Sequence, residues 1–178
     1  MATISWGKPS KFETTPSVDL APAPEAVWKS IETPKDGTLQ INVTEGSEVN
    51  ALEEGGGVID TRYNANTYEL TFTEFVKKGK KPIFEDADGV VAGEHAFRFL
   101  PEDPTCEGRQ IDCATVRVVE TFTTADGILR QYKAKGKKPK TGNTVKPYKV
   151  EAAAEPAKAS ETPKASETQS AKSNSAKE

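Results

Sequence analysis

Few residues of this chain combine into a pattern that could perform catalysis. Acyl transfer and related reactions need a nucleophile, a base and a group that orients the base. The chain has one histidine, His95, which shares strand parity with Phe97 and Phe99. A histidine beside an apolar face is more often packed against it, or at its rim, than used as a base. No pair of carboxylates stands out from the turns and polar strand faces, so we expect no catalytic residues and no enzymatic activity.

Metal, phosphate and cofactor sites are equally weak in the sequence. Cys106 and Cys113 are the only cysteines, and with His95 they lack the fourth ligand and the spacing of a zinc site. We expect both to be reduced, although two strand-borne cysteines could also pair across a hairpin. Residues 85–89 (EDADG) resemble half of a calcium loop but lack its closing glutamate, which favours a turn. Residues 54–57 (EGGG) precede neither Lys-Ser/Thr nor a helix, so they predict no phosphate loop. The sequence predicts no cofactor.

Composition limits the remaining possibilities. A chain of 178 residues is long enough for one domain and an appendage. Its formal net charge of -3 provides no overall basic field for nucleic-acid binding. No apolar run approaches the ~20 residues of a membrane span, and the N-terminal residues do not resemble a signal peptide. We therefore expect no membrane association, and a protein that stays in the cytoplasm where it is made or leaves it by cell lysis.

The elements that would position any site are strands. Apolar residues occupy every second position in residues 38–44 (TLQINVT) and 66–73 (NTYELTFT), the period of a half-buried strand. Asp126-Gly127 between two such runs marks a hairpin, and a phase slip after Phe72 suggests a bulge near Thr73-Glu74. The pattern predicts a mostly antiparallel β-sandwich over residues 1–150 with little helix, and its expected strands are Thr3–Trp6, Val27–Ile31 (alternatively helical), Gly37–Glu45, Val58–Tyr63, Thr67–Val76, His95–Leu100, Thr115–Thr123, Gly127–Lys133 and Val145–Val150.

Strand parity also predicts the core. The inward-facing residues are expected to be Leu39, Ile41, Val43, Tyr68, Leu70, Phe72, Phe97, Phe99, Val116, Val118 and Phe122. Glu120 interrupts the last row, so that strand either leaves the core there or pairs the carboxylate.

Two segments are expected to lie outside the core. Residues 151–178 contain no aromatic residue and no aliphatic residue larger than alanine, with two copies of Lys-Ala-Ser-Glu-Thr. Such a segment cannot offset a backbone entropy loss of about 1–2 kcal/mol per residue, so we expect a disordered C-terminal tail that is dispensable for folding and assembly. At about residues 8–24, four prolines and few apolar residues predict an extended N-terminal arm.

Two loops are candidate contacts with a neighbouring subunit. The first, Ser47–Gly57, follows a well-formed strand and contains Leu52 in an otherwise polar run, ending in Glu53, Glu54, Gly55, Gly56 and Gly57. The glycines would allow close backbone approach; the alternative is a mobile hairpin tip. The second contains Lys77, Lys78, Lys80 and Lys81, which could meet phosphate or an acidic partner. Its alternative role is to keep strand ends soluble and to blunt sheet edges.

Beside these patterns, the order of strands and turns over residues 1–150 resembles the tail tube (major tail) proteins of tailed bacteriophages and phage-like particles. The segments that carry the resemblance are 4–8 (ISWGK), 33–40 (TPKDGTLQ), 53–56 (EEGG), 63–68 (YNANTY), 88–93 (DGVVAG), 100–104 (LPEDP) and 125–127 (ADG). The chain departs from that family in lacking a convincing helix.

The resemblance implies a virion structural protein, made in the host cytoplasm and located in the tail. In that family a β-sandwich forms hexameric rings that stack into a tube, contact other tail proteins and let DNA pass as cargo. The basic segment Arg130–Lys149 would then lie outside the tube or at a ring interface, because a lumen is expected to repel DNA. The alternatives are a monomeric Ig-like or carbohydrate-binding module and a capsid decoration protein.

Overall fold

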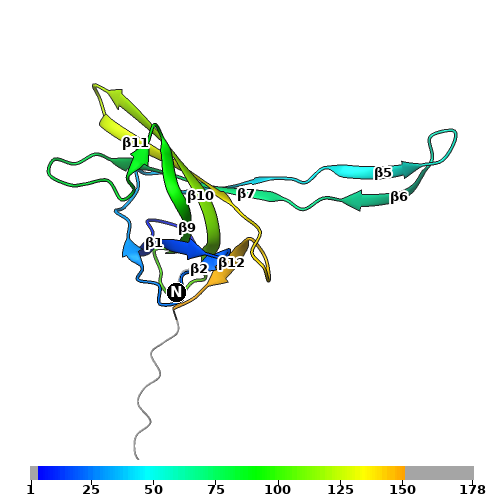
Figure 1. Cartoon of the computed structure of the whole chain (residues 1–178), viewed down its shortest axis with the longest axis horizontal. Coiled ribbons are helices and arrows are strands. Elements are labelled where there is room, and N and C mark those ends of the chain that lie inside the picture. Colours follow the sequence, from blue (N-terminus) through cyan, green and yellow to red (C-terminus); the bar gives the residue numbers. More distant parts are fainter. Residues whose placement is uncertain (1–3, 151–178) are drawn as a thin grey trace, which may run out of the picture.

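The computed structural model describes residues 4–150, which contain strands, turns and loops but no helix. The predicted all-β, antiparallel fold class is confirmed (Figure 1). The strands are β1 (Lys11–Val18), β2 (Ala21–Pro22), β3 (Lys29–Ser30), β4 (Gln40–Thr44), β5 (Glu48–Leu52), β6 (Val58–Tyr63), β7 (Thr67–Phe75), β8 (Asp86–Ala87), β9 (Val90–Leu100), β10 (Gly108–Thr123), β11 (Gly127–Gly136) and β12 (Val145–Tyr148).

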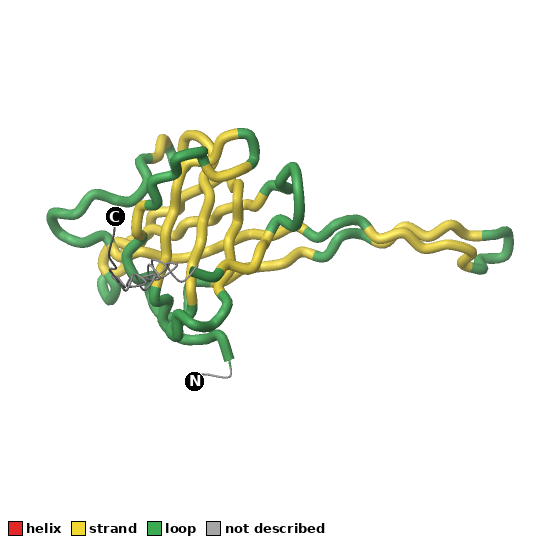
Figure 2. The backbone as a smooth tube through the Cα atoms, turned by 90° about the horizontal axis from the view of Figure 1, so that it is seen from below, coloured by secondary structure: helices red, strands yellow, loops and turns green. Residues whose placement is uncertain are grey.

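Ten of these strands form one sheet in the order β2-β1-β9-β10-β11-β7-β4, with β12 beside β10, β3 beside β1 and β8 beside β9. The sheet curls into an open half-barrel (Figures 1 and 2). The strands next to its two edges meet across the interior, since the Phe12 ring on β1 packs against the Phe72 ring on β7. The two layers of the expected sandwich are therefore opposite parts of one curled sheet.

The core lies on the concave face of this sheet. Leu70, Phe72, Phe97, Val116 and Val118 are buried as predicted, while Leu39, Ile41 and Phe99 are partly buried and pack against this cluster. Phe84 and Tyr132 complete an aromatic group around Phe72 and Phe97.

Two residues predicted to be in the core are exposed. Val43 is 51% exposed because β4 leads away from the body toward β5, and Phe122 is 70% exposed because β10 extends beyond the core. The alternation of the sequence placed Phe122 on the correct face of β10, but it did not show that Phe122 lies beyond the end of the core.

The prediction of an extended N-terminal arm is wrong for residues 11–18. They form β1, which pairs with β9 from Lys11↔Leu100 to Pro16↔His95. Phe12 is buried, and so are Thr14 and Thr15. The Thr14 hydroxyl donates a hydrogen bond of 2.9 Å to the Ala96 carbonyl, which satisfies a polar group that would otherwise be costly to bury.

Other local predictions differ from the structure. Residues 4–6 are not a strand, and Val27–Ile31 contains only the two-residue β3 and no helix. The bulge predicted near Thr73-Glu74 is absent, because β7 keeps one continuous register with β11 from Glu69 to Phe75. Phe75 interrupts the apolar phase because it lies on the opposite face from Phe72. Thr3 and the predicted tail, residues 151–178, lie outside the described residues.

Candidate assembly surfaces

The most conspicuous surface is a hairpin, residues 45–66, that leaves the body between β4 and β7. We call it the projecting hairpin. Its strands β5 and β6 pair only with each other, from Glu48↔Tyr63 to Leu52↔Val58. Figures 1 and 2 show it extending well beyond the curled sheet. All residues of both strands are exposed, so the hairpin contributes nothing to the core of its own chain.

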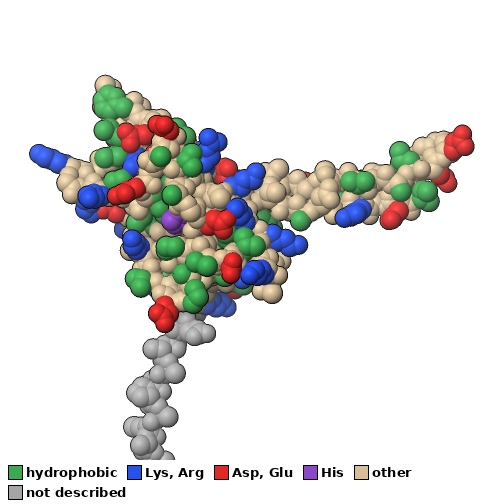
Figure 3. Space-filling view, viewed as in Figure 1, with side chains coloured by type: hydrophobic (Ala, Val, Ile, Leu, Met, Phe, Trp, Pro, Cys, Tyr) green, Lys and Arg blue, Asp and Glu red, His purple; other side chains and the backbone are tan. Residues whose placement is uncertain are grey.

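The projecting hairpin is both apolar and acidic. Its exposed large apolar side chains are Val49, Leu52, Val58, Ile59 and Tyr63. Its acidic side chains are Glu45, Glu48, Glu53, Glu54 and Asp60, against Arg62 as the one basic residue. Figure 3 shows hydrophobic side chains along this hairpin and acidic ones at its end. An isolated two-stranded hairpin is at best marginally stable in water, and polar contacts such as the Thr61 hydroxyl to Asn50, 2.7 Å, add little.

The tip of the hairpin is a glycine turn. The Glu53 amide donates to the Gly57 carbonyl at 2.9 Å, and Gly55 and Gly56 adopt φ values of +104° and +90°. Such φ values favour glycine. The predicted contact loop Ser47–Gly57 thus comprises strand β5 and this turn. Leu52, at the end of β5, is 60% exposed, so it is not a core residue.

The second predicted contact surface is the loop that follows β7, with Lys77, Lys78, Lys80 and Lys81; we call it the lysine loop. Lys77 and Lys80 both pair with Glu32, whose pKa is lowered by the hydrogen bonds from Lys77 and Lys80. Within residues 4–150, neither Lys78 nor Lys81 takes part in an ion pair. In Figures 1 and 2 the lysine loop and the projecting hairpin leave opposite sides of the body, so one chain does not bring the two predicted surfaces together.

A third surface was missed by the sequence reasoning. Strands β10, β11 and β7 carry three successive rows of side chains on the core face. The first, Val118–Tyr132–Phe72, is core; the second, Glu120–Arg130–Glu74, is polar. The third is Phe122–Ile128–Val76, in which the Val76 amide continues the ladder to the Ile128 carbonyl at 3.0 Å. These three side chains, which we call the distal row, are 70%, 40% and 42% exposed.

The polar row is held in place by ion pairs and by a hydrogen bond. Arg130 is buried and pairs with Asp86 on β8, and its Nε lies 3.9 Å from a Glu120 carboxylate oxygen. Glu74 is also buried and accepts a hydrogen bond of 3.2 Å from the Tyr132 hydroxyl. Burial raises the pKa of Glu74, an effect that this hydrogen bond opposes. The row is therefore a polar layer between the core and the distal row.

The residues considered for catalysis have structural contacts. His95 is half-buried, packs edge-on against Phe84 with 4.7 Å between ring centroids, and places Nε2 3.1 Å from the Ala92 carbonyl. Burial lowers its pKa. The Cys113 thiol donates to Glu94 at 2.8 Å, and burial followed by this bond raises its pKa to about 12. Such a thiol is a poor nucleophile at neutral pH. No disulfide joins Cys113 to Cys106.

The calcium-like segment 85–89 is a turn. Asp86 accepts a hydrogen bond of 3.0 Å from the Gly89 amide and also pairs with Arg130. Asp88 and Gly89 have φ values of +50° and +81°, as in tight hairpin turns. Within residues 4–150 no cluster of His, Cys, Asp and Glu has the arrangement of a metal site.

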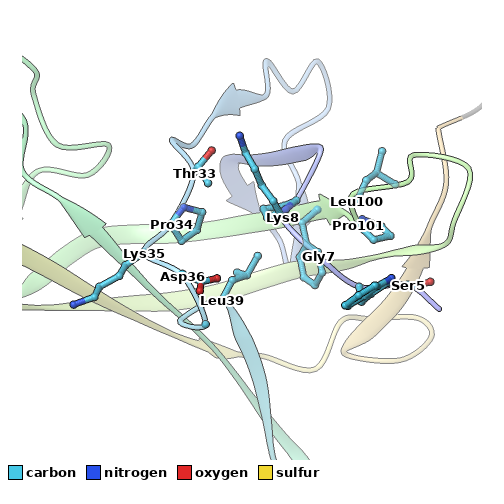
Figure 4. Close-up of a pocket in the computed structure, with 14 residues that line it drawn as sticks. Ser5, Gly7, Lys8, Thr33, Pro34, Lys35, Asp36, Leu39, Leu100 and Pro101 are labelled. Carbon is cyan, nitrogen blue, oxygen red and sulfur yellow. The ribbon is translucent and has the colours of Figure 1, made fainter. Parts of the chain in front are cut away.

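A hollow of about 620 Å³ lies between residues 5–9, 33–39 and 99–101 (Figure 4). Pro34, Leu39, Leu100 and Pro101 give it apolar walls. Lys35 points away from the other labelled side chains in Figure 4 and binds Asp126 at 2.7 Å. The described lining residues include no histidine or cysteine, so the hollow does not combine a nucleophile with an imidazole base.

Comparisons with known proteins assign no family. No protein-family model matches the chain, and no curated protein matches it. Among solved structures, the chain is similar to the sheath/tube terminator of an extracellular contractile injection system (PVC) in its extended state, determined by cryo-EM. The identity is 9%, the match covers 78% of this chain and 94% of that chain, and the TM-score is 0.46. Within residues 4–150 there is no helix long and apolar enough to cross a membrane.

Proposed function

We propose that this chain is a structural, non-catalytic subunit of a phage tail or phage-like particle, in which copies associate into hexameric rings. The rings stack into a tube that contacts other tail proteins and encloses the channel through which DNA passes. The projecting hairpin makes the principal contact between copies. The sequence resemblance over residues 1–150 supplies the kind of assembly, and the hairpin supplies the physical reason to assemble.

One observation carries this proposal. The projecting hairpin exposes five large apolar side chains, Val49, Leu52, Val58, Ile59 and Tyr63, on two strands that the rest of the described chain does not cover. Exposed large apolar side chains gathered on one element that its own chain does not cover are typical of contact sites. Covering these side chains would contribute about 25 cal/mol for each Å² of apolar surface removed from water.

The body does not need the hairpin for its own stability. Its core is closed by β1, β7, β9, β10 and β11, whose aromatic rings contact one another directly. A subunit with a self-sufficient body and an uncovered extension is suited to associate after it has folded.

Sedimentation velocity and negative-stain microscopy of the full chain test the proposal. Rings or tubes that increase with concentration support it, and six-fold class averages support the hexamer. The matched control replaces residues 48–63 by an Asn-Gly turn, which is feasible because the Asn64 amide lies 3.0 Å from the Ser47 carbonyl. This variant should keep its circular dichroism and remain monomeric. A full-length chain that is monomeric at all concentrations and binds glycans would overturn the proposal in favour of a binding module.

A further inference from the structure

The distal row cannot belong to the core of its own chain. Phe122, Ile128 and Val76 lie on the core face, but the polar row Glu120–Arg130–Glu74 separates them from Tyr132 and Phe72. The charged groups of that row are held by Asp86 and by the Tyr132 hydroxyl. The distal row is therefore an isolated apolar strip at the end of three strands, and Figure 3 shows hydrophobic side chains exposed at this end of the body.

Lysines border one end of the distal row. The lysine loop begins at the residue after Val76. Glu32 holds two of its ammonium groups, those of Lys77 and Lys80, which fixes the loop against the body. Lys78 and Lys81 extend from this anchored loop without an ion-pair partner among the described residues. The surface thus combines an apolar strip with positive charge beside it.

The projecting hairpin has the complementary composition. Its apolar side chains could cover the distal row, and Glu53 and Glu54 at its tip are opposite in charge to Lys78 and Lys81. The two surfaces lie on opposite sides of one body (Figures 1 and 2), so the hairpin cannot reach the distal row of its own chain. A contact between different patches on two copies is heterologous and produces a ring when the rotation closes.

We propose that the distal row, together with Lys78 and Lys81, is the docking surface for the projecting hairpin of a second copy of this chain. This inference rests on the proposed self-assembly and adds the acceptor surface to it. The apolar strip covers hairpin side chains such as Leu52 and Val58, and the two lysines face the acidic tip. Charge complementarity of this kind mainly sets register and partner choice.

Cross-linking between two variants, each with one exposed cysteine, tests the contact. Both carry Cys106→Ser, and one adds Leu52→Cys while the other adds Phe122→Cys; the remaining Cys113 is buried. A short bis-maleimide should join the two variants as a heterodimer when they are mixed, and each variant alone should give at least tenfold less dimer. Val27→Cys replaces Phe122→Cys in the control, since Val27 is also exposed but lies elsewhere.

A charge exchange provides an independent measurement on the full chain. Lys78→Glu with Lys81→Glu should raise the concentration needed for assembly at least tenfold, and so should Glu53→Lys with Glu54→Lys. A chain with all four changes should recover most of the loss. Lys138→Glu, at another exposed lysine, should leave the assembly concentration unchanged.

The outcomes separate this inference from the proposed function. Two results would overturn the docking surface while self-assembly stands. One is that rings or tubes form without the Leu52–Phe122 cross-link. The other is that the chain with all four charge changes needs as high a concentration for assembly as the two double variants. A chain that remains monomeric would overturn both. Every substituted side chain except that of Cys106 is exposed, so the melting temperatures of all variants should stay near that of the wild type. Measuring them excludes unfolding as the cause of any loss of assembly.

Discussion

The Phe12 ring on β1 meets the Phe72 ring on β7 edge to face, with 5.0 Å between their centroids and an interplanar angle of 87°. The two residues are far apart in the sequence and in the order of the sheet, where β9, β10 and β11 lie between their strands. Their contact closes the curled sheet over its core. It also makes the N-terminal strand a structural part of the domain.

Replacing Phe12 with alanine should therefore destabilise the body strongly. Loss of a buried phenylalanine typically costs about 3–5 kcal/mol, because burial is lost and a cavity remains. Urea denaturation monitored by circular dichroism measures the change. Val18→Ala on the same strand is the control, since Val18 is exposed; a similar small effect for both would show that β1 is not needed to close the core.

Replacing Leu52 with aspartate should weaken assembly and leave folding unchanged. Leu52 is exposed in the single chain, but a charge there would be desolvated in a contact between copies. Sedimentation velocity should show a loss of large species, while the melting temperature stays near that of the wild type. Val27→Asp, at an exposed position of the body, is the control. A large fall in melting temperature would mean that Leu52 stabilises its own chain.

Replacing Glu74 with glutamine should change how stability depends on pH. Burial raises the pKa of Glu74 above its ordinary value of 4.5, so the folded chain holds this proton more tightly than the unfolded chain. The Glu74 contribution to stability is full below pH 4.5 and is lost as pH rises through the folded pKa. Glutamine, which can still accept from Tyr132, should make the protein more stable at pH 7 and flatten this part of the profile.

Urea titrations of both proteins from pH 4 to pH 8 measure the Glu74 effect. Glu69→Gln on the same strand is the control, because Glu69 forms no ion pair within residues 4–150. A variant that is less stable than the wild type at pH 7 would show that the Glu74 charge stabilises the polar row.

Cys113 should resist thiol reagents while the chain is folded. It is fully buried, and its pKa is raised to about 12, so little thiolate exists at neutral pH. In a Cys106→Ser variant, labelling with iodoacetamide at pH 8 should proceed only as fast as the protein opens. Mild urea should accelerate it, and rapid labelling without denaturant would contradict the burial of this thiol.

Strand periodicity predicted much of the fold. The alternation around Leu70 and Phe72 and around Val116 and Val118 placed these residues in the core, and β6 has the predicted bounds Val58–Tyr63. Asp126-Gly127 forms the predicted hairpin turn, with Gly127 at a φ of +74°. These features are local, so the sequence contains them directly.

Strand β1 could not be found in the same way. Its buried positions include Thr14 and Thr15, and threonines beside Pro16 look like a polar extended segment. Thr14 is tolerated in the interior because β9 provides a hydrogen-bond acceptor, the Ala96 carbonyl, whereas the buried Thr15 hydroxyl has no hydrogen-bond partner among the described residues. The Ala96 carbonyl is distant in the sequence, and a hydrophobicity pattern does not record it.

The candidate surfaces were predictable in part. The exposed Leu52 and the glycine turn followed from composition, and their role as contacts is a prediction. Phe122 was assigned to the core because parity gives the face of a strand and not the point at which the core ends. Glu120 was the available signal, since a carboxylate on the core face of β10 marks where burial stops.

The polar row Glu120–Arg130–Glu74 also affects how this protein can evolve. Because charged groups separate the distal row from the aromatic core, substitutions at Phe122, Ile128 or Val76 should leave the packing of Phe72 and Tyr132 unchanged. The docking surface proposed for this end of the body could therefore change under selection without loss of folding stability. Related subunits should retain the core aromatics while the three outer side chains vary together with whatever they contact.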